Sequence, residues 1–95
     1  MDDVKKVNLF PPIAGKYDKH YKLVEQCYEY IDRMNTQIER IQSDTNMSII
    51  EKQRKITRCQ DNINGYKNEI IETREYLQTR NAWTVAMQQR FEKLK

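Results

Sequence analysis

The chain has 95 residues, of which 38% are hydrophobic and 33% are charged, and 17 Lys and Arg stand against 14 Asp and Glu. This length permits one domain with a modest core, and the charge content excludes a rounded single-core globule. The interspersed charges, with a net charge of +3, indicate a solvated helix surface more than a nucleic-acid footprint.

Targeting signals are not visible in the sequence. The first residues, MDDVKK, lack the apolar core of a signal peptide. No apolar run approaches the roughly 18 residues of a membrane span. We therefore expect a protein without a membrane span, in the cytoplasm or another reducing intracellular compartment.

Residues 1–15 are predicted to form an extended N-terminal arm. The stretch NLFPPIAG contains both prolines and one of the two glycines of the chain. Pro11 and Pro12 are tolerated only at or before the start of a helix, so the arm cannot extend the helix that follows. Phe10 and Ile13 give the arm apolar side chains that could pack near Trp83 of the same chain or dock on another chain.

The first predicted helix covers about residues 16–43. Between residues 17 and 43 there is no proline or glycine, and apolar residues recur at alternating spacings of three and four. This alternation is typical of the buried seam of a coiled coil. The seam residues are Val24, Cys27, Ile31, Met34, Ile38 and Ile41.

A turn is predicted at residues 44–48, and a second helix from residue 49. Ser48 and Glu51 fit a capping box, in which each side chain bonds to the backbone amide of the other residue. The second helix repeats an apolar residue every seven positions, at Ile49, Ile56, Ile63, Ile70 and Leu77. Gly65 falls on its outer face and costs about 1 kcal/mol relative to alanine without ending the helix.

The short turn between two seams predicts an all-α fold, an antiparallel two-helix coiled-coil hairpin. Pairing outward from the turn puts Ile41 beside Ile50 and Cys59 opposite Asp32. In that register the two cysteines are too far apart for a disulfide. We therefore expect Cys27 and Cys59 to be buried free thiols.

The part of the hairpin far from the turn is predicted to be broad and apolar. Tyr21, Tyr28 and Tyr30 flank the seam of the first helix, where a two-stranded coiled coil usually has charges. In this register, residues beyond Leu77 have no partner in the first helix. They form either an overhanging continuation of the second helix to residue 95, or a break near residues 79–82 followed by a short third helix that folds back.

Enzymatic chemistry is not expected. His20 is the only histidine and ends the apolar stripe, the two cysteines are separated, and no glycine-rich phosphate loop is present. We expect no catalytic residue, cofactor, metal or small-molecule substrate. One basic stretch could contact nucleic acid, a less favoured interpretation because Glu51 and Asp61 dilute its charge. Its cations are Lys52, Arg54, Lys55 and Arg58.

The sequence indicates a non-enzymatic protein–protein interaction module, a small structural or adaptor subunit of a larger assembly of identical or different chains. Buried aromatic side chains tend to carry interface energy. The expected interface residues are Phe10, Ile13, Tyr21, Tyr28, Tyr30, Trp83, Met87 and Phe91. Two alternatives stay open: a small inhibitor that occludes one target protein, and a dimeric helical bundle that binds nucleic acid through its basic tips.

Overall fold

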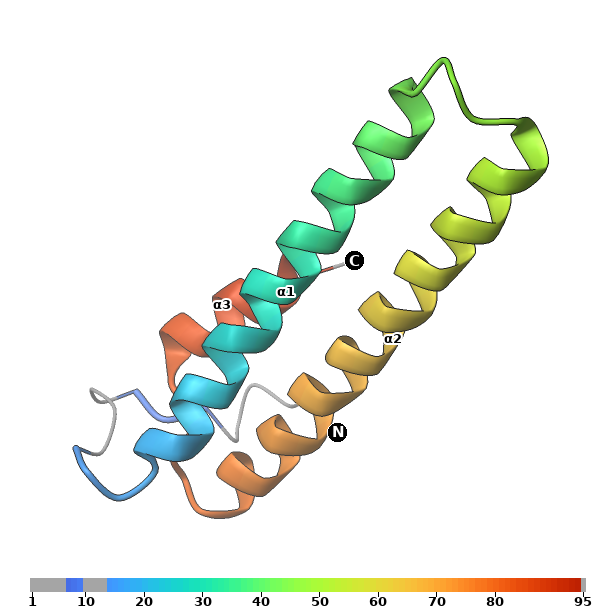
Figure 1. Cartoon of the computed structure of the whole chain (residues 1–95). Helices are drawn as coiled ribbons and strands as arrows, with labels where there is room; N and C mark the ends of the chain where they lie inside the picture. Colours follow the sequence, from blue (N-terminus) through green and yellow to red (C-terminus); the bar gives the residue numbers. More distant parts are fainter. Residues whose placement is uncertain (1–6, 10–13, 95) are drawn as a thin grey trace.

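A computed structural model describes residues 7–9 and 14–94 (Figure 1). These residues form three helices, α1 (Asp18–Ser43), α2 (Ile49–Thr79) and α3 (Val85–Glu92). The helices α1 and α2 lie side by side and run in opposite directions, and α3 lies against their lower half (Figure 1). The prediction of an all-α helical hairpin is confirmed. We call the end of the hairpin that carries α3 the base, and the end that carries residues 44–48 the tip.

The start of α2 is set by Ser48, as the sequence predicts. Its hydroxyl oxygen accepts a hydrogen bond from the Glu51 backbone amide at 3.1 Å. Within the preceding turn, the Asp44 carboxylate accepts from the Asn46 amide at 2.7 Å. The Ser48 bond satisfies one of the first amides of α2, which have no intrahelical partner, and the Asp44 bond fixes the turn between the helices.

The predicted register of the two helices is wrong by several residues. Cys59 Sγ lies 3.7 Å from Gln37 Oε1, not opposite Asp32. Tyr30 stacks on Tyr66 with ring centroids 5.1 Å apart. Cys27 and Cys59 are both buried and free, as predicted. Ten residues of α1 separate Cys27 from the level of Cys59, which is about 15 Å along the helix axis.

The shift in register arises at the tip. The first turn of α2 projects beyond the end of α1, so Ile49 and Ile50 are 74% and 69% exposed. Ile50 therefore does not pair with Ile41. The first close link between the helices is made by Lys52, whose ammonium group donates to the Gln42 carbonyl oxygen at 3.2 Å. Counting pairs outward from the first residue of α2 misses this projecting turn.

The same shift removes the predicted overhang at the base. His20, near the start of α1, stacks on Tyr76, near the end of α2, at 4.5 Å. The two helices therefore reach the base at the same level. The second helix does not continue to residue 95, because it ends at Thr79 and the chain folds back into α3. Of the two predicted arrangements, the structure has the break with a short third helix.

Backbone hydrogen bonds explain why α2 stops. The Ala82 amide donates to the Leu77 carbonyl at 2.8 Å, and the Asn81 amide donates to Gln78 at 3.1 Å. Asn81 has a φ of 55°, in the left-handed region. This combination is the Schellman ending of a helix, for which asparagine is the commonest residue after glycine. Thr84 then caps α3 by accepting a hydrogen bond from the Met87 amide at 3.2 Å.

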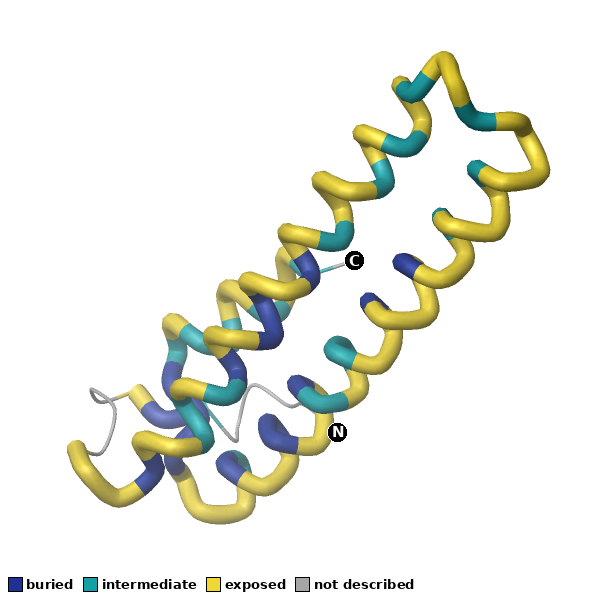
Figure 2. The backbone as a smooth tube through the Cα atoms, in the orientation of Figure 1, coloured by how far each residue is buried: buried dark blue, intermediate teal, exposed yellow. Residues whose placement is uncertain are grey.

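The core is concentrated in the base of the hairpin, where buried residues of α1 and α2 face each other (Figure 2). Trp83, Ile70 and Leu77 are its largest fully buried side chains. Toward the tip, the seam residues Met34, Ile38, Ile41 and Ile56 are only partly buried. Cys59 is the one buried residue between residues 32 and 62. The seam is thus continuous along the hairpin, but only its lower half has a third element covering it.

Part of the N-terminal arm is bound to the base. Asn8 forms a parallel bridge with Thr84, in the connection between α2 and α3. Its amide donates to the Trp83 carbonyl at 2.7 Å, and its carbonyl accepts from the Val85 amide at 3.1 Å. Phe10 and Ile13, the two arm residues expected at an interface, lie outside the described residues.

Candidate protein-interaction surface

The broad apolar base that the sequence predicts is occupied by the chain itself. The Tyr21 hydroxyl donates to the Ala82 carbonyl at 3.0 Å. Tyr28 is 5% exposed and lies under the Arg90 guanidinium, which is 4.2 Å from its ring centroid. The same guanidinium forms two hydrogen bonds with the Glu25 carboxylate, at 2.7 and 3.0 Å. Two of the three flanking tyrosines therefore face the C-terminal part of this chain.

Three further expected interface residues belong to the covering element. Trp83 is fully buried, and its indole N–H donates to Gln88 Oε1 at 2.8 Å. Phe91 meets the Trp83 ring edge-on at 6.2 Å and is partly buried, as is Met87. Met87 and Phe91 of α3, together with Trp83 just before it, therefore pack against the core at the base.

Tyr30 is the one of the described expected interface residues that has substantial exposure, at 38%. Its ring stacks on Tyr66 of α2, and the Arg33 guanidinium lies 5.6 Å from its centroid. A groove of about 440 Å³ beside this pair also contains Leu23 and Gly65. Apart from its own chain neighbours and helix backbone, no heavy atom lies within 4 Å of the position a Cβ would take on Gly65, so this surface is open.

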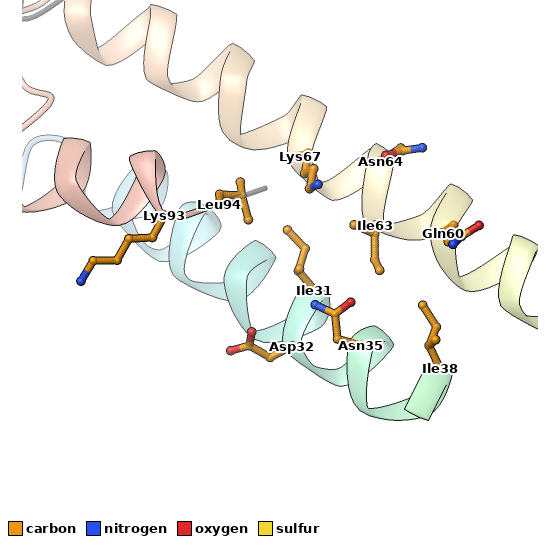
Figure 3. Close-up of a pocket in the computed structure, with 10 residues that line it drawn as sticks. All are labelled: Ile31, Asp32, Asn35, Ile38, Gln60, Ile63, Asn64, Lys67, Lys93 and Leu94. Atoms are coloured by element: carbon orange, nitrogen blue, oxygen red, sulfur yellow. The ribbon is translucent and has the colours of Figure 1, made fainter. Parts of the chain in front are cut away.

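A larger groove begins where α3 ends. It has a volume of about 660 Å³ and lies between α1 and α2 on the side that carries α3. In Figure 3, Ile31 and Ile38 of α1 and Ile63 of α2 point into the space between the helices. Leu94, just beyond α3, closes the base end of the groove. The floor therefore continues the hydrophobic seam, from the buried Ile31 and Ile63 to the partly buried Ile38.

The walls of this groove are polar. Asn35 on α1 and Gln60 and Asn64 on α2 supply uncharged amide groups, and charged side chains stand at its base end. Those charged residues are Asp32, Lys67 and Lys93. Sequence reasoning missed the groove because amides beside a seam indicate a narrow, closed hairpin. The visible signal was that tyrosines flank the seam at the base but amides replace them toward the tip.

The four cations of the predicted nucleic-acid contact do not share one environment. Lys52 is engaged with the Gln42 carbonyl. Lys55 lies 3.7 Å from the Glu51 carboxylate. Lys55 and Arg58 line a small pocket together with Arg40 of α1, whereas Arg54 is exposed and not part of this lining. The structure thus brings two of the four together and adds Arg40, which the sequence reasoning did not single out.

The titratable groups of the core lie in packed surroundings. Burial, with a smaller contribution from the Glu69 carboxylate, raises the pKa of the Cys27 thiol. Burial also raises the pKa of Tyr28, although the Arg90 guanidinium opposes this shift. His20 packs between Tyr17 and Tyr76. Cys27 is 3% exposed and packs in the core, and a thiol with a raised pKa stays protonated at neutral pH.

Within residues 7–9 and 14–94, no three His, Cys, Asp or Glu side chains are grouped so that they could hold a metal ion. The helices in the described part of the chain also include none that is long and apolar enough to cross a membrane. No protein-family model, curated protein or solved structure matches this chain. The interaction surface must therefore be judged on its own geometry.

Proposed function

We propose that this chain is a non-enzymatic interaction module, a small structural or adaptor subunit that binds an amphipathic helix of a partner protein in the groove beyond α3. The observation that supports the proposal is that this groove continues the surface on which α3 packs. One side of one hairpin is covered by a helix at the base and left open toward the tip.

The chain itself supplies an example of what fits this side of the hairpin. The apolar contacts of the α3 segment come from Met87, Phe91 and Leu94, at positions i, i+4 and i+7. A helix with that spacing presents one apolar stripe. Ile31 and Ile63, which belong to the core at the base, also form the floor where the groove begins. A partner helix in line with α3 would meet the same kind of surface.

The chemistry of the walls supports a helix with uncharged or weakly charged flanks. Asn35, Gln60 and Asn64 can both donate and accept hydrogen bonds. Burying them beside a partner costs little only if those bonds are made. Ile31 and Ile63 are already buried, at 4% and 8% exposed, whereas Ile38 and Leu94 are only partly buried. A partner would gain by covering the apolar surface of Ile38 and Leu94 that is still exposed, at roughly 25 cal/mol for each Å² removed from water.

The test is affinity purification from cells of the source organism, with wild-type chain and two variants as bait. Asn35→Arg places a charged side chain on the groove wall. Thr57→Arg makes the same change in charge at an exposed position of α2 that does not line the groove. Circular dichroism and the urea midpoint establish that both variants keep the fold.

We expect a protein that co-purifies with the wild type and with Thr57→Arg at equal yield. Its yield should fall about tenfold or more with Asn35→Arg, because a long charged side chain on the wall would occupy the groove and would have to be buried beside the partner. Equal recovery with Asn35→Arg and wild type would overturn the assignment of the groove.

A further inference from the structure

A second pocket lies near the tip and differs in chemistry from the groove. It has a volume of about 380 Å³ and is bounded by α1, the turn and α2. Three cations line it, Arg40 from α1 and Lys55 and Arg58 from α2, and no carboxylate does. Ile41 and Met47 supply apolar surface in the same pocket.

We propose that this pocket binds an acidic peptide segment of a partner protein, in which carboxylates flank an aliphatic side chain. The carboxylates would bind Arg40 and Arg58, and the aliphatic side chain would cover Ile41 and Met47. This site extends the proposed function, because it neither requires a helix nor shares any lining residue with the groove. Arg58 and Gln60, which line the two sites, are about 200° apart around α2.

Within the described residues, the three cations of this pocket keep their capacity to bind carboxylates of a partner. Arg40 and Arg58 have no carboxylate there at ion-pair distance. Lys55 faces Glu51 at 3.7 Å, and both side chains are about half exposed, at 52% and 49%. An exposed pair of this kind contributes little, so a partner carboxylate can compete for Lys55. Arginine also binds a carboxylate through two parallel hydrogen bonds, which gives the site geometric selectivity.

The arrangement favours an acidic peptide over a nucleic acid. A nucleic-acid backbone is bound by a track of cations that follows successive phosphates. Here Lys52 bonds to the Gln42 carbonyl and Arg54 lies outside the pocket, so the basic stretch is divided. The apolar part of the pocket gives a phosphate backbone nothing to pack on, whereas a Leu or Ile side chain would bury surface there.

The experiment uses fluorescence anisotropy of the full chain at low salt with a short labelled peptide of sequence Glu-Glu-Leu-Glu-Glu. A peptide of the same length with glutamine in place of glutamate, and a labelled single-stranded oligonucleotide, are the comparison probes. The chain is used as wild type and as Arg40→Glu, Arg58→Glu and Arg54→Glu. Arg54→Glu is the matched control, because it makes the same charge reversal on the same helix outside the pocket.

We expect saturable binding of the glutamate peptide that weakens about tenfold or more in Arg58→Glu and Arg40→Glu and less than about twofold in Arg54→Glu, as for contact versus remote charges. The glutamine peptide should bind at least about tenfold more weakly. Equal losses in Arg54→Glu and Arg58→Glu, or tighter binding of the oligonucleotide than of the peptide, would overturn the proposal.

The groove variant separates this proposal from the proposed function. Asn35→Arg should bind the glutamate peptide as the wild type does, because Asn35 does not line the pocket. Loss of peptide binding in Asn35→Arg overturns the separate pocket. Failure of the peptide to bind any form of the chain also overturns the pocket, and it leaves the result of the affinity purification unaffected.

Discussion

The backbone of Asn8 is hydrogen-bonded on both sides of Thr84, to the carbonyl of Trp83 and to the amide of Val85. This contact joins the N-terminal arm to the connection between α2 and α3. It covers the segment that contains Trp83, the largest fully buried side chain. The arm therefore helps to close the base, and the position of α3 depends on residues at the other end of the sequence.

Asn8→Pro is expected to destabilise the base. Proline has no amide hydrogen, so the bond to the Trp83 carbonyl is lost, and the residue before it is restricted. Asn8→Ala is the matched control because it removes the side chain but keeps the amide. We expect Asn8→Pro to lower the free energy of unfolding by about 1–2 kcal/mol more than Asn8→Ala does. Urea unfolding followed by Trp83 fluorescence measures this, and coincident midpoints for the two variants would contradict it.

Asn81 sets the end of α2. A glycine substitution there should change the free energy of unfolding in the opposite direction from a glycine substitution inside the helix. At its φ of 55°, Asn81→Gly should be neutral or stabilising, while Asn81→Val should cost about 1–2 kcal/mol. At Asn68, an exposed position within α2, glycine should instead destabilise by up to about 1 kcal/mol. Thermal unfolding of the glycine and valine variants at both positions tests this, and a destabilising Asn81→Gly contradicts the helix ending.

The sequence predicts the helices of this fold but not the register in which they pair. The seam from Val24 to Ile41, the cap at Ser48 and the seven-residue repeat from Ile49 to Leu77 are local patterns that physical rules convert directly into two helices. The register was not predictable in this way. It depends on how far the first turn of α2 projects past α1, which the chemistry of a five-residue turn does not fix.

The error in register also explains what was missed at the interaction surface. An overhang assumed beyond Leu77 left Trp83 and Phe91 without partners, so they were expected at an interface. With His20 at the level of Tyr76, α3 folds back and these rings are covered. The open groove instead begins beyond the end of α3, along Ile31, Ile38 and Ile63. These isoleucines gave no signal in the sequence, because a seam residue looks the same whether two helices or three enclose it.

Stability should fall in alkaline solution. The pKa of Cys27 in the folded chain is raised above its ordinary value of 9.0, and that of Tyr28 above 10.0. The folded state therefore retains protons that the unfolded state releases. This contribution is complete below the pKa values of the unfolded chain and is lost as the pH rises through the folded values.

Urea midpoints between about pH 7 and about pH 10.5 measure this loss, because in the unfolded chain both groups lose their protons in the upper part of that range. Cys27→Ala removes the thiol and should flatten the part of the decline that begins near pH 9, while leaving the part due to Tyr28. An unchanged slope in Cys27→Ala would show that the thiol does not contribute.

The register can be tested by cross-linking. Because Cys59 Sγ lies 3.7 Å from Gln37 Oε1, Gln37→Cys in a Cys27→Ala background should form a disulfide with Cys59 on oxidation. The matched variant is Asp32→Cys in the same background, which the register expected from the sequence alone would favour. Five residues along α1 separate the two positions, or about 7 Å, beyond the tolerance of a disulfide. Thiol titration and intact mass report which pair closes.

We expect oxidation of the Gln37→Cys chain as a monomer, with a gain of about 3 kcal/mol in stability from the closed loop. The Asp32→Cys chain should retain two free thiols under the same conditions. Faster closure in Asp32→Cys would support the register expected from the sequence, in which Cys59 faces Asp32 and Trp83 lies beyond the end of α1. It would also place the groove between different residues, so the same measurement tests the frame on which both proposed sites depend.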